Sequence, residues 1–256
     1  KKYHKAGQPM LDPYPRVILI PRVGMITTGK NLAEAKIAQE IYEHSMKVQA
    51  GASAIDRYQS LPLAKAFETE YWPLELYKLS LAPKEKEFAR RVVWVTGAAG
   101  GIGRATVKLF SDKGWRVIGV DRNPFGEDFP SNGLFIQSDI SHADEIAAIF
   151  EKAHQFTDSL DALVNNAAMQ IAKPLIETTV EEWDAVMNAN LRSVFLGVKL
   201  AHPLLKARGG AAVVNVSSVH AIQTSANIAA YAASKGGLLA LTRAMAIEFA
   251  PDNIRV

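Results

Sequence analysis

The order of apolar and polar residues divides the chain into two parts. From Arg91 to Val256, short apolar runs alternate with longer stretches in which apolar residues recur at helical spacing. Short apolar runs are typical of buried parallel strands, and the longer stretches are typical of amphipathic helices. We therefore expect strands at 92–95, 115–120, 134–137, 160–164 and 211–216, a new strand beginning near 253, and helices at 104–113, 141–156, 181–208 and 227–250. This alternation predicts an α/β fold with a doubly wound parallel sheet and ligands at the carboxyl ends of its strands.

Two details refine the expected helices. Ser141 stands at the expected start of the helix at 141–156, where a hydroxyl group can cap free backbone N–H groups. The helical period of 181–208 is interrupted around 188–190. We expect Ser141 to be an N-cap and the long helix to be irregular at the interruption.

Residues 1–80 show a weaker pattern. Val17–Ile20 is a strand-like run, 26–29 is a second short extended piece, and Asn31 precedes a helical period that starts at Leu32. Further short helical stretches follow, but this part has little with which to form a core of its own. The charged stretch 82–89 comes next. We expect two units, 1–80 and 91–256, joined by a linker at 81–90.

The stretch 91–103, RVVWVTGAAGGIG, joins an expected strand to an expected helix through a glycine-rich turn. Such a turn sets free backbone N–H groups and the positive end of a helix against a pyrophosphate. Gly97 allows the tight turn, Gly101 lets the backbone approach the phosphates, and Gly103 lets the helix pack on the strand. Asp121 ends the next expected strand, about twenty residues on, where a carboxylate accepts hydrogen bonds from ribose hydroxyls. The alternative is a purely structural turn and a carboxylate that only starts the next loop.

A second group of polar residues follows the strand expected at 211–216. Ser217 and Ser218 come directly after it, and Tyr231 and Lys235 share one face of the next helix because they are four residues apart. A tyrosine hydroxyl titrates near pH ~10 in water, and a neighbouring ammonium group favours its ionised form. Tyr231 is thus a candidate base for a hydroxyl proton, with Lys235 as its charge partner and Ser218 holding the reacting oxygen. Taken singly, each feature also occurs by accident on helices and in turns.

In combination, these motifs resemble the short-chain dehydrogenase/reductase family. Residues 96–103 resemble its TGxxxGIG turn, 165–168 its NNAG segment, Ser218 its catalytic serine, and Tyr231 with Lys235 its YxxxK pair. The resemblance covers 91–256 and implies a Rossmann-type fold and hydride transfer between a nicotinamide cofactor and a small-molecule substrate. It implies four catalytic residues, namely Ser218, Tyr231, Lys235 and Asn190, the last with a main chain that holds a water leading to the lysine. The implied cofactor-binding residues are Gly97, Gly101, Ile102, Gly103, Asp121, Asp139 at the adenine ring, Ile140, Asn166 at the adenine-side ribose, Tyr231 and Lys235.

Charge favours NAD over NADP as the cofactor. The Asp121 carboxylate repels a ribose 2′-phosphate, and Gly100 supplies no cation where NADP-preferring relatives often carry one. Arg122 acts in the opposite direction. Ala168 stands where the family has glycine, a small change. The family pattern continues past Val256 with a Pro-Gly turn, a substrate loop and a last strand, so we expect activity to depend on that continuation.

The N-terminal part resembles the tail of a class II aldolase/adducin domain, in 17–29, in the alanine-rich helix and in 71–74. Such a tail ahead of a short-chain dehydrogenase resembles the bifunctional rhamnulose-1-phosphate aldolase/lactaldehyde dehydrogenase family. The implied substrate is L-lactaldehyde or a related small hydroxy-aldehyde, alcohol or sugar. Two alternatives stay open, a different polyol or sugar phosphate as substrate, and a non-catalytic NAD-binding regulator or scaffold. Gln170, His220 and Gln223 follow strand ends and are candidate substrate contacts or ordinary surface residues.

Composition changes this picture little. The formal net charge is +3, with basic residues gathered at the N-terminus and the expected linker, so we expect no nucleic-acid partner. No apolar run is long enough to span a bilayer, residues 1–13 lack a signal-peptide core, and there is no cysteine. His4 and His44 are isolated, so no metal is expected. The apolar faces of 191–205 and 238–249 exceed what one sheet face needs. In the family that the chain resembles, these helices form the dimer and tetramer contacts, so the resemblance implies a homodimer or homotetramer, which we expect to be cytoplasmic.

Overall fold

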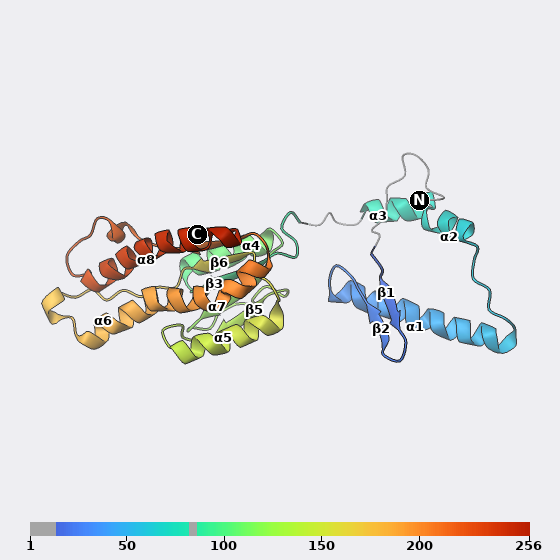
Figure 1. Cartoon of the computed structure of the whole chain (residues 1–256), viewed down its shortest axis with the longest axis horizontal. Helices are drawn as coiled ribbons and strands as arrows, with labels where there is room; N and C mark the ends of the chain where they lie inside the picture. Colours follow the sequence, from blue (N-terminus) through green and yellow to red (C-terminus); the bar gives the residue numbers. More distant parts are fainter. Residues whose placement is uncertain (1–13, 82–85) are drawn as a thin grey trace. The chain divides into compact units, whose positions relative to one another are not determined.

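The computed structural model describes residues 14–81 and 86–256. The chain divides into two compact units, Lys1–Pro83 and Lys84–Val256 (Figure 1). The expectations for the first 13 residues, including His4, and for the linker residues 82–85 lie outside the described residues. The domain limits at 1–80 and 91–256 stay predictions.

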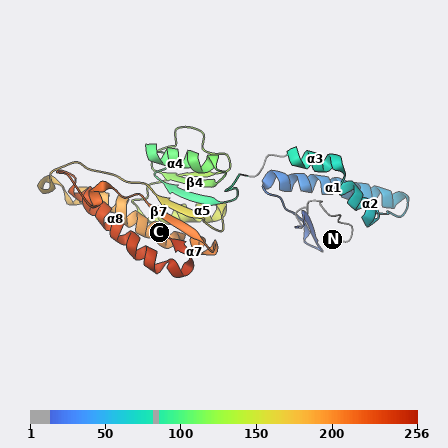
Figure 2. The ribbon, with the colours of Figure 1, turned by 90° about the horizontal axis from the view of Figure 1, so that it is seen from above.

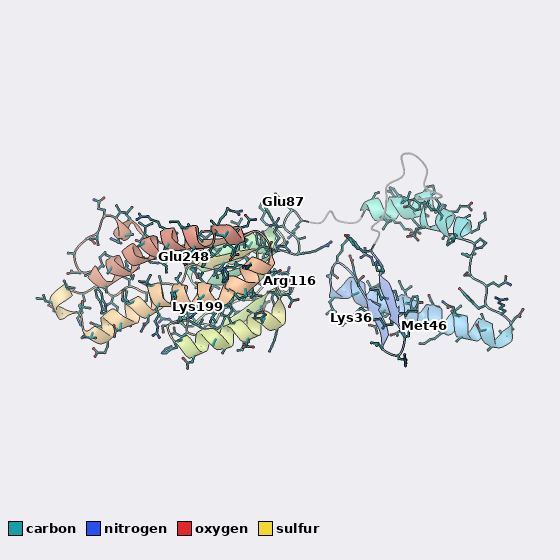
Figure 3. The ribbon with its side chains drawn as sticks, viewed as in Figure 1. Lys36, Met46, Glu87, Arg116, Lys199 and Glu248 are labelled. Carbon is teal, nitrogen blue, oxygen red and sulfur yellow. The ribbon has the colours of Figure 1, made fainter. Side chains whose placement is uncertain are left out.

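The described part of the first unit consists of a hairpin and three helices. β1 (Val17–Ile20) pairs antiparallel with β2 (Gly24–Thr27), and α1 (Leu32–Ile55), α2 (Leu63–Glu70) and α3 (Pro73–Leu81) follow. No residue among 14–81 is buried, and side chains of α1 such as Lys36 and Met46 stand exposed (Figure 3). This part of the chain therefore has no hydrophobic core of its own.

The second unit is built around a six-stranded parallel sheet. Its strand order is β5-β4-β3-β6-β7-β8. The strands are β3 (Val92–Thr96), β4 (Arg116–Asp121), β5 (Leu134–Gln137), β6 (Ala162–Asn165), β7 (Ala211–Asn215) and β8 (Ile254–Arg255). The predicted fold class is confirmed, with strand limits that differ slightly from those expected, as at β6, which begins at Ala162 rather than at residue 160.

Helices cover both faces of this sheet (Figures 1 and 2). α4 (Gly101–Asp112) lies on one face, and α5 (Ala143–Phe156), α7 (Ser193–Ala207) and α8 (Ala229–Glu248) lie on the other. The side chains of successive residues in β3 point to opposite faces of the sheet, as in any pleated strand. Val93 packs in the cluster that includes Val107 of α4, whereas the Trp94 ring lies 4.6 Å from the Phe150 ring of α5.

The two expected helix details had different outcomes. The interruption near 188–190 is confirmed, because α6 (Val180–Met187) is followed by a π-helix (Asn188–Arg192) before α7 begins. The expectation of Ser141 as N-cap is wrong, since α5 begins at Ala143 with His142 at the cap position. The Ser141 N–H donates to Asp139 Oδ1 at 2.9 Å, so Ser141 belongs to a turn that precedes the helix.

The strand order reverses beside β3. The chain runs from β3 to β4 and β5 on one side, then returns to β6 on the other side of β3. At such a switch point the loops after neighbouring strands diverge and leave a crevice at the carboxyl edge of the sheet. Gly97 follows β3 and Asn166 follows β6, so both lie at that crevice.

Close packing of α4 on the turn after β3 depends on Gly103. A Cβ atom at this position would lie 1.9 Å from the Gly97 carbonyl oxygen and 2.9 Å from Ala98 Cα. Gly103→Ala must therefore push α4 off the sheet, and we expect the free energy of unfolding to fall by about 1–3 kcal/mol. Gly101→Ala is the matched control, because its Cβ meets nothing within 4 Å. Urea unfolding compares the two variants, and equal stability would contradict the packing argument.

Candidate active site

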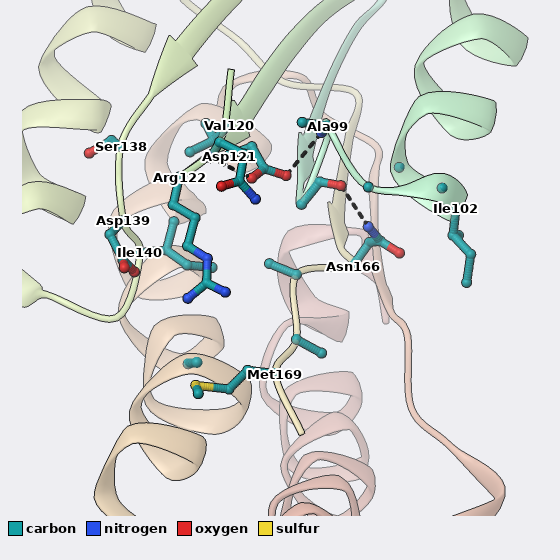
Figure 4. A pocket seen from close by; sticks show the side chains of 18 residues that line it. Ala99, Ile102, Val120, Asp121, Arg122, Ser138, Asp139, Ile140, Asn166 and Met169 are labelled. Carbon is teal, nitrogen blue, oxygen red and sulfur yellow. Dashed lines mark hydrogen bonds between the residues drawn. The ribbon is translucent and has the colours of Figure 1, made fainter. Parts of the chain in front are cut away.

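A cavity of about 500 Å³ lies at the carboxyl ends of β3, β4, β5 and β6. Its wall is formed by the glycine turn and start of α4, the end of β4, and the loops after β5 and β6 (Figure 4). The predicted residues that line it are Gly97, Gly101, Ile102, Gly103, Asp121, Asp139, Ile140 and Asn166. The fold thus brings these residues together from four separate stretches of chain. Its wall also contains Arg122, Ala168 and Met169, of which Met169 was not singled out from the sequence.

Hydrogen bonds lock the glycine turn to the loop after β6. The Asn166 Nδ2 group donates to the carbonyl oxygens of Thr96 at 3.0 Å and Gly97 at 3.2 Å. In return, Thr96 Oγ1 accepts the N–H groups of Asn166 and Ala167, both at 3.1 Å. Gly97 has a φ of +67°, and a Cβ there would lie 2.8 Å from Ala167 Cα. The turn therefore requires glycine both for its backbone conformation and for this close approach.

The start of α4 gives the cavity groups that suit an anion. The first N–H groups of a helix, here those of Gly101 and Ile102, have no acceptor within the helix, and both residues line the cavity. These groups and the positive end of the helix dipole suit a phosphate group. The residues present therefore fit a dinucleotide.

Two aspartates shape the opposite end of the cavity. Asp121 accepts the Ala99 N–H through Oδ2 and the Asn123 N–H through Oδ1, each at 2.9 Å, so it also ties β4 to the glycine turn. For Asp139, burial alone would raise the pKa, but hydrogen bonds from Ser141 keep the pKa of this carboxyl below its ordinary value. The oxygens of both side chains can accept further hydrogen bonds.

Ser218 and Tyr231 lie on neighbouring elements. Ser218 caps a short 3₁₀ turn (Val219–Ala221), and its Oγ accepts the His220 N–H at 3.2 Å. The His220 ring lies edge-on to the Tyr231 ring, with 6.0 Å between centroids, and its Nδ1 is buried without a partner among the described residues. Gln170 and Gln223 are both exposed. The structure thus places His220 beside Tyr231 and leaves the two glutamines at the surface.

Lys235 is an almost completely buried lysine, with 2% of its surface exposed. Its ammonium group donates to the Val216 carbonyl oxygen at 2.7 Å and lies 5.8 Å from the centroid of the Tyr231 ring. Burial lowers the pKa of Lys235 from 10.5 to about 8. The group is therefore still mainly charged at neutral pH, close to the tyrosine with which it was predicted to act.

Asn190 lies in the π-helix and is fully buried. Its Oδ1 accepts the Met169 N–H and its Nδ2 donates to the Met169 carbonyl, both at 2.8 Å. The second Nδ2 proton goes to Ser234 Oγ at 3.0 Å. The amide side chain is thus committed to structural hydrogen bonds, and only its main chain is left for the role implied by the family resemblance.

The described residues contain neither a metal-binding cluster nor a helix that could cross a membrane. Among residues 14–81 and 86–256, no group of three or more His, Asp or Glu side chains is placed to hold a metal ion. Within the same ranges, no helix combines the length and the apolar character needed to cross a membrane.

Comparison with known proteins places the second unit in a family. Residues 91–256 match the family model described as short chain dehydrogenase, and residues 1–79 match that of aldolase class II, second domain. The chain belongs to the short-chain dehydrogenase family. An uncharacterized oxidoreductase of Bacillus subtilis, YuxG, is 35% identical over 261 residues. That match takes in 98% of this chain but only 38% of the relative, so the chain spans well under half of its length.

Solved structures agree with this assignment. Aldohexose dehydrogenase of Thermoplasma acidophilum is 30% identical with a TM-score of 0.62, over 66% of this chain and 65% of that one. The 3-ketoacyl-(acyl-carrier-protein) reductase of Brucella melitensis, solved with NADH, is 31% identical with a TM-score of 0.63, over 66% and 74%. In both cases the matched share, 66% of this chain, is about the size of the second unit alone.

Burial of Lys235 predicts a stability that depends on pH. The pKa of Lys235 is about 8 in the folded protein and 10.5 ordinarily. Between these two pH values the unfolded chain holds a proton on Lys235 that the folded protein has released. The contribution of this site to stability therefore rises with pH across that window, by about 3 kcal/mol at most. We expect the unfolding free energy of the wild type to gain this amount relative to Lys235→Met between about pH 7 and about pH 11.

Urea unfolding at several pH values makes this measurement. Lys199→Met is the matched control, because Lys199 is an exposed lysine on α7. The difference in unfolding free energy between Lys199→Met and the wild type should stay constant over the same pH window. If the difference for Lys235→Met is constant as well, the expectation of a buried ammonium group at Lys235 is contradicted.

Proposed function

We propose that residues 91–256 form an NAD-dependent dehydrogenase that transfers hydride between the cofactor and a small hydroxy-aldehyde, alcohol or sugar. One observation carries the proposal. A cavity lined by the glycine turn and Asp121 lies at the carboxyl edge of the sheet, the edge at which Ser218 follows β7. Tyr231 and Lys235 lie on α8, which contacts the 3₁₀ turn that Ser218 caps. The family match over 91–256 and the NADH in the Brucella neighbour support it.

The described residues suit each part of the cofactor. The N–H groups of Gly101 and Ile102 would hold the pyrophosphate, Asp121 the ribose hydroxyls, and Asp139 with Ile140 the adenine end. When bound, the nicotinamide accepts or supplies the hydride. Because Asp121 is a carboxylate, it favours NAD over NADP.

The protein's own groups handle the proton. In its ionised form, the Tyr231 phenolate oxygen takes the proton of the substrate hydroxyl and becomes a hydroxyl group, and the Lys235 ammonium group stabilises the phenolate. The Lys235 ammonium group lies 5.8 Å from the centroid of the Tyr231 ring. At about this distance a unit charge stabilises an opposite charge by roughly 3 kcal/mol at an effective dielectric constant of ~20, which shifts the ionisation equilibrium of the tyrosine about a hundredfold. Ser218 Oγ accepts its hydrogen bond from the His220 N–H, so its own proton is free to be donated to the reacting oxygen.

The first unit supports the choice of substrate. Residues 1–79 match an aldolase class II model, and YuxG matches across both units. An aldolase and a dehydrogenase in one chain can act in turn on one aldehyde, and we propose L-lactaldehyde from rhamnose-type sugar breakdown. Its hydrate loses hydride from carbon and a hydroxyl proton to Tyr231, which leaves a carboxylic acid.

The test is NADH formation by the protein in its full natural length, with L-lactaldehyde beside a panel of polyols and sugar phosphates. We expect turnover of lactaldehyde that falls by at least about a hundredfold in Tyr231→Phe, because the base is removed. Tyr77→Phe, at an exposed tyrosine of α3, should match the wild type. Turnover of a polyol alone would contradict the substrate, and NADH binding without any turnover would favour a non-catalytic binder.

The charge of Asp121 should decide between NAD and NADP. Asp121→Ser removes the repulsion of a 2′-phosphate while keeping a hydrogen-bond acceptor, so we expect the ratio of NADP to NAD affinity to rise about tenfold or more. Glu127→Ser is the control, because it removes an exposed carboxylate from the loop that follows β4. Fluorescence titration with NADH and NADPH gives both ratios, and an equal rise in the two variants would contradict a local effect.

We also propose that the protein works as a cytoplasmic homodimer or homotetramer. Exposed apolar side chains on the helices of the second unit support association, among them Phe195 on α7 and Ile247 on α8. Light scattering of the protein tests it, and a monomer at all concentrations would contradict it.

A further inference from the structure

We infer that Ser234 is a positioning residue, whose hydroxyl fixes the turn of α8 that carries Tyr231 and Lys235. The inference rests on the proposed function, in which that turn supplies the base. Ser234 is fully buried and directly precedes Lys235. The sequence analysis gave it no role.

The hydrogen bonds of Ser234 connect two elements. Its Oγ donates to the Tyr231 carbonyl oxygen at 2.7 Å and accepts the Asn190 Nδ2 group at 3.0 Å. The same Asn190 amide holds the backbone N–H and carbonyl of Met169, which lines the cavity. An unbroken chain of hydrogen bonds therefore runs from the cavity wall through the π-helix to the backbone of Tyr231.

A second attachment holds the other side of this turn. The Lys235 ammonium donates to the Val216 carbonyl at 2.7 Å, and Ser217 Oγ donates to the Lys235 carbonyl at 3.2 Å. Hydrogen bonds thus hold the turn to the end of β7 on one side and to the π-helix on the other. Without the Ser234 hydroxyl only the hydrogen bonds to the end of β7 remain, and Tyr231 is free to shift relative to the cavity.

The choice of residue agrees with this role. Serine is a poorer helix former than alanine, and a buried hydroxyl is unfavourable unless it is hydrogen-bonded. A serine in the middle of α8 that only filled space would therefore be worse than alanine. Both of its hydrogen bonds are made, and both lead to residues of the proposed site.

The same helix supplies a matched control. Thr242 Oγ1 donates to the Leu238 carbonyl at 2.7 Å and accepts the Asn215 Nδ2 group at 2.9 Å. Thr242 thus repeats the arrangement of Ser234, one hydroxyl between a helix carbonyl and a side-chain amide, about two turns further along α8. It bonds to no residue that the proposed reaction uses.

The experiment compares Ser234→Ala with Thr242→Val in the protein in its full natural length. Each variant leaves a side-chain amide donor without its partner, so similar drops in melting temperature are expected. Only Ser234→Ala should lower kcat, by about tenfold or more, with little change in the KM for NAD and a shifted pH–rate profile. Wild-type kcat and pH profile in Ser234→Ala, or equal losses in both variants, would overturn the inference.

A second measurement does not depend on turnover. The Met169 N–H donates to Asn190 Oδ1, so its hydrogen exchange reports on the far end of the chain of hydrogen bonds. Ser234→Ala should speed this exchange about tenfold, while Thr242→Val leaves it unchanged. If the wild type turns over no substrate, the proposed function fails, and the exchange alone decides on Ser234. Equal exchange in the two variants would then refute its positioning role.

Discussion

The site depends on the hydrogen bonds between Asn166 and the turn after β3. Parallel pairing of β3 with β6 brings residues 97 and 166 to the same sheet edge although they are far apart in sequence. The Asn166 amide and the Thr96 hydroxyl then hold the two loops together. This fixes the start of α4, and with it the N–H groups that face the cavity. Asp121 adds a third attachment through the Ala99 N–H.

A second constraint is electrostatic and concerns α8. Burying an ammonium group is unfavourable, and burial accordingly lowers the pKa of Lys235. A single hydrogen bond to the Val216 carbonyl compensates only part of it. A residue that weakens the fold in this way is expected where it serves chemistry. The proposed role of Lys235 beside Tyr231 gives the reason for keeping a charge in this position.

Much of the second unit could be predicted from the sequence, because its strands are short apolar runs and its helices show a clear period. The meeting of Gly97, Asp121, Asp139 and Asn166 at one cavity was predictable for a related reason, since these residues follow strand ends and share a recognisable spacing. Ser141 was wrongly placed because its backbone is held by Asp139, a contact that helix-start rules do not include.

Other features could not be predicted because they depend on which elements lie side by side. The roles of Met169 and Ser234 follow from the meeting of the π-helix with α8. The attachment of Asp121 to the glycine turn likewise requires β4 to lie next to β3. The first unit differs, since its helices were predictable but none of its residues 14–81 is buried.

The most direct test of this account is the affinity for NADH of the wild type and of Asn166→Leu, measured by fluorescence titration. The variant keeps a side chain of similar size but removes the donors to the Thr96 and Gly97 carbonyls. We predict saturable binding by the wild type and at least about tenfold weaker binding by the variant, a difference of about 1.4 kcal/mol. Equal affinities, or no binding by the wild type, would contradict the claim that this switch point builds a dinucleotide site.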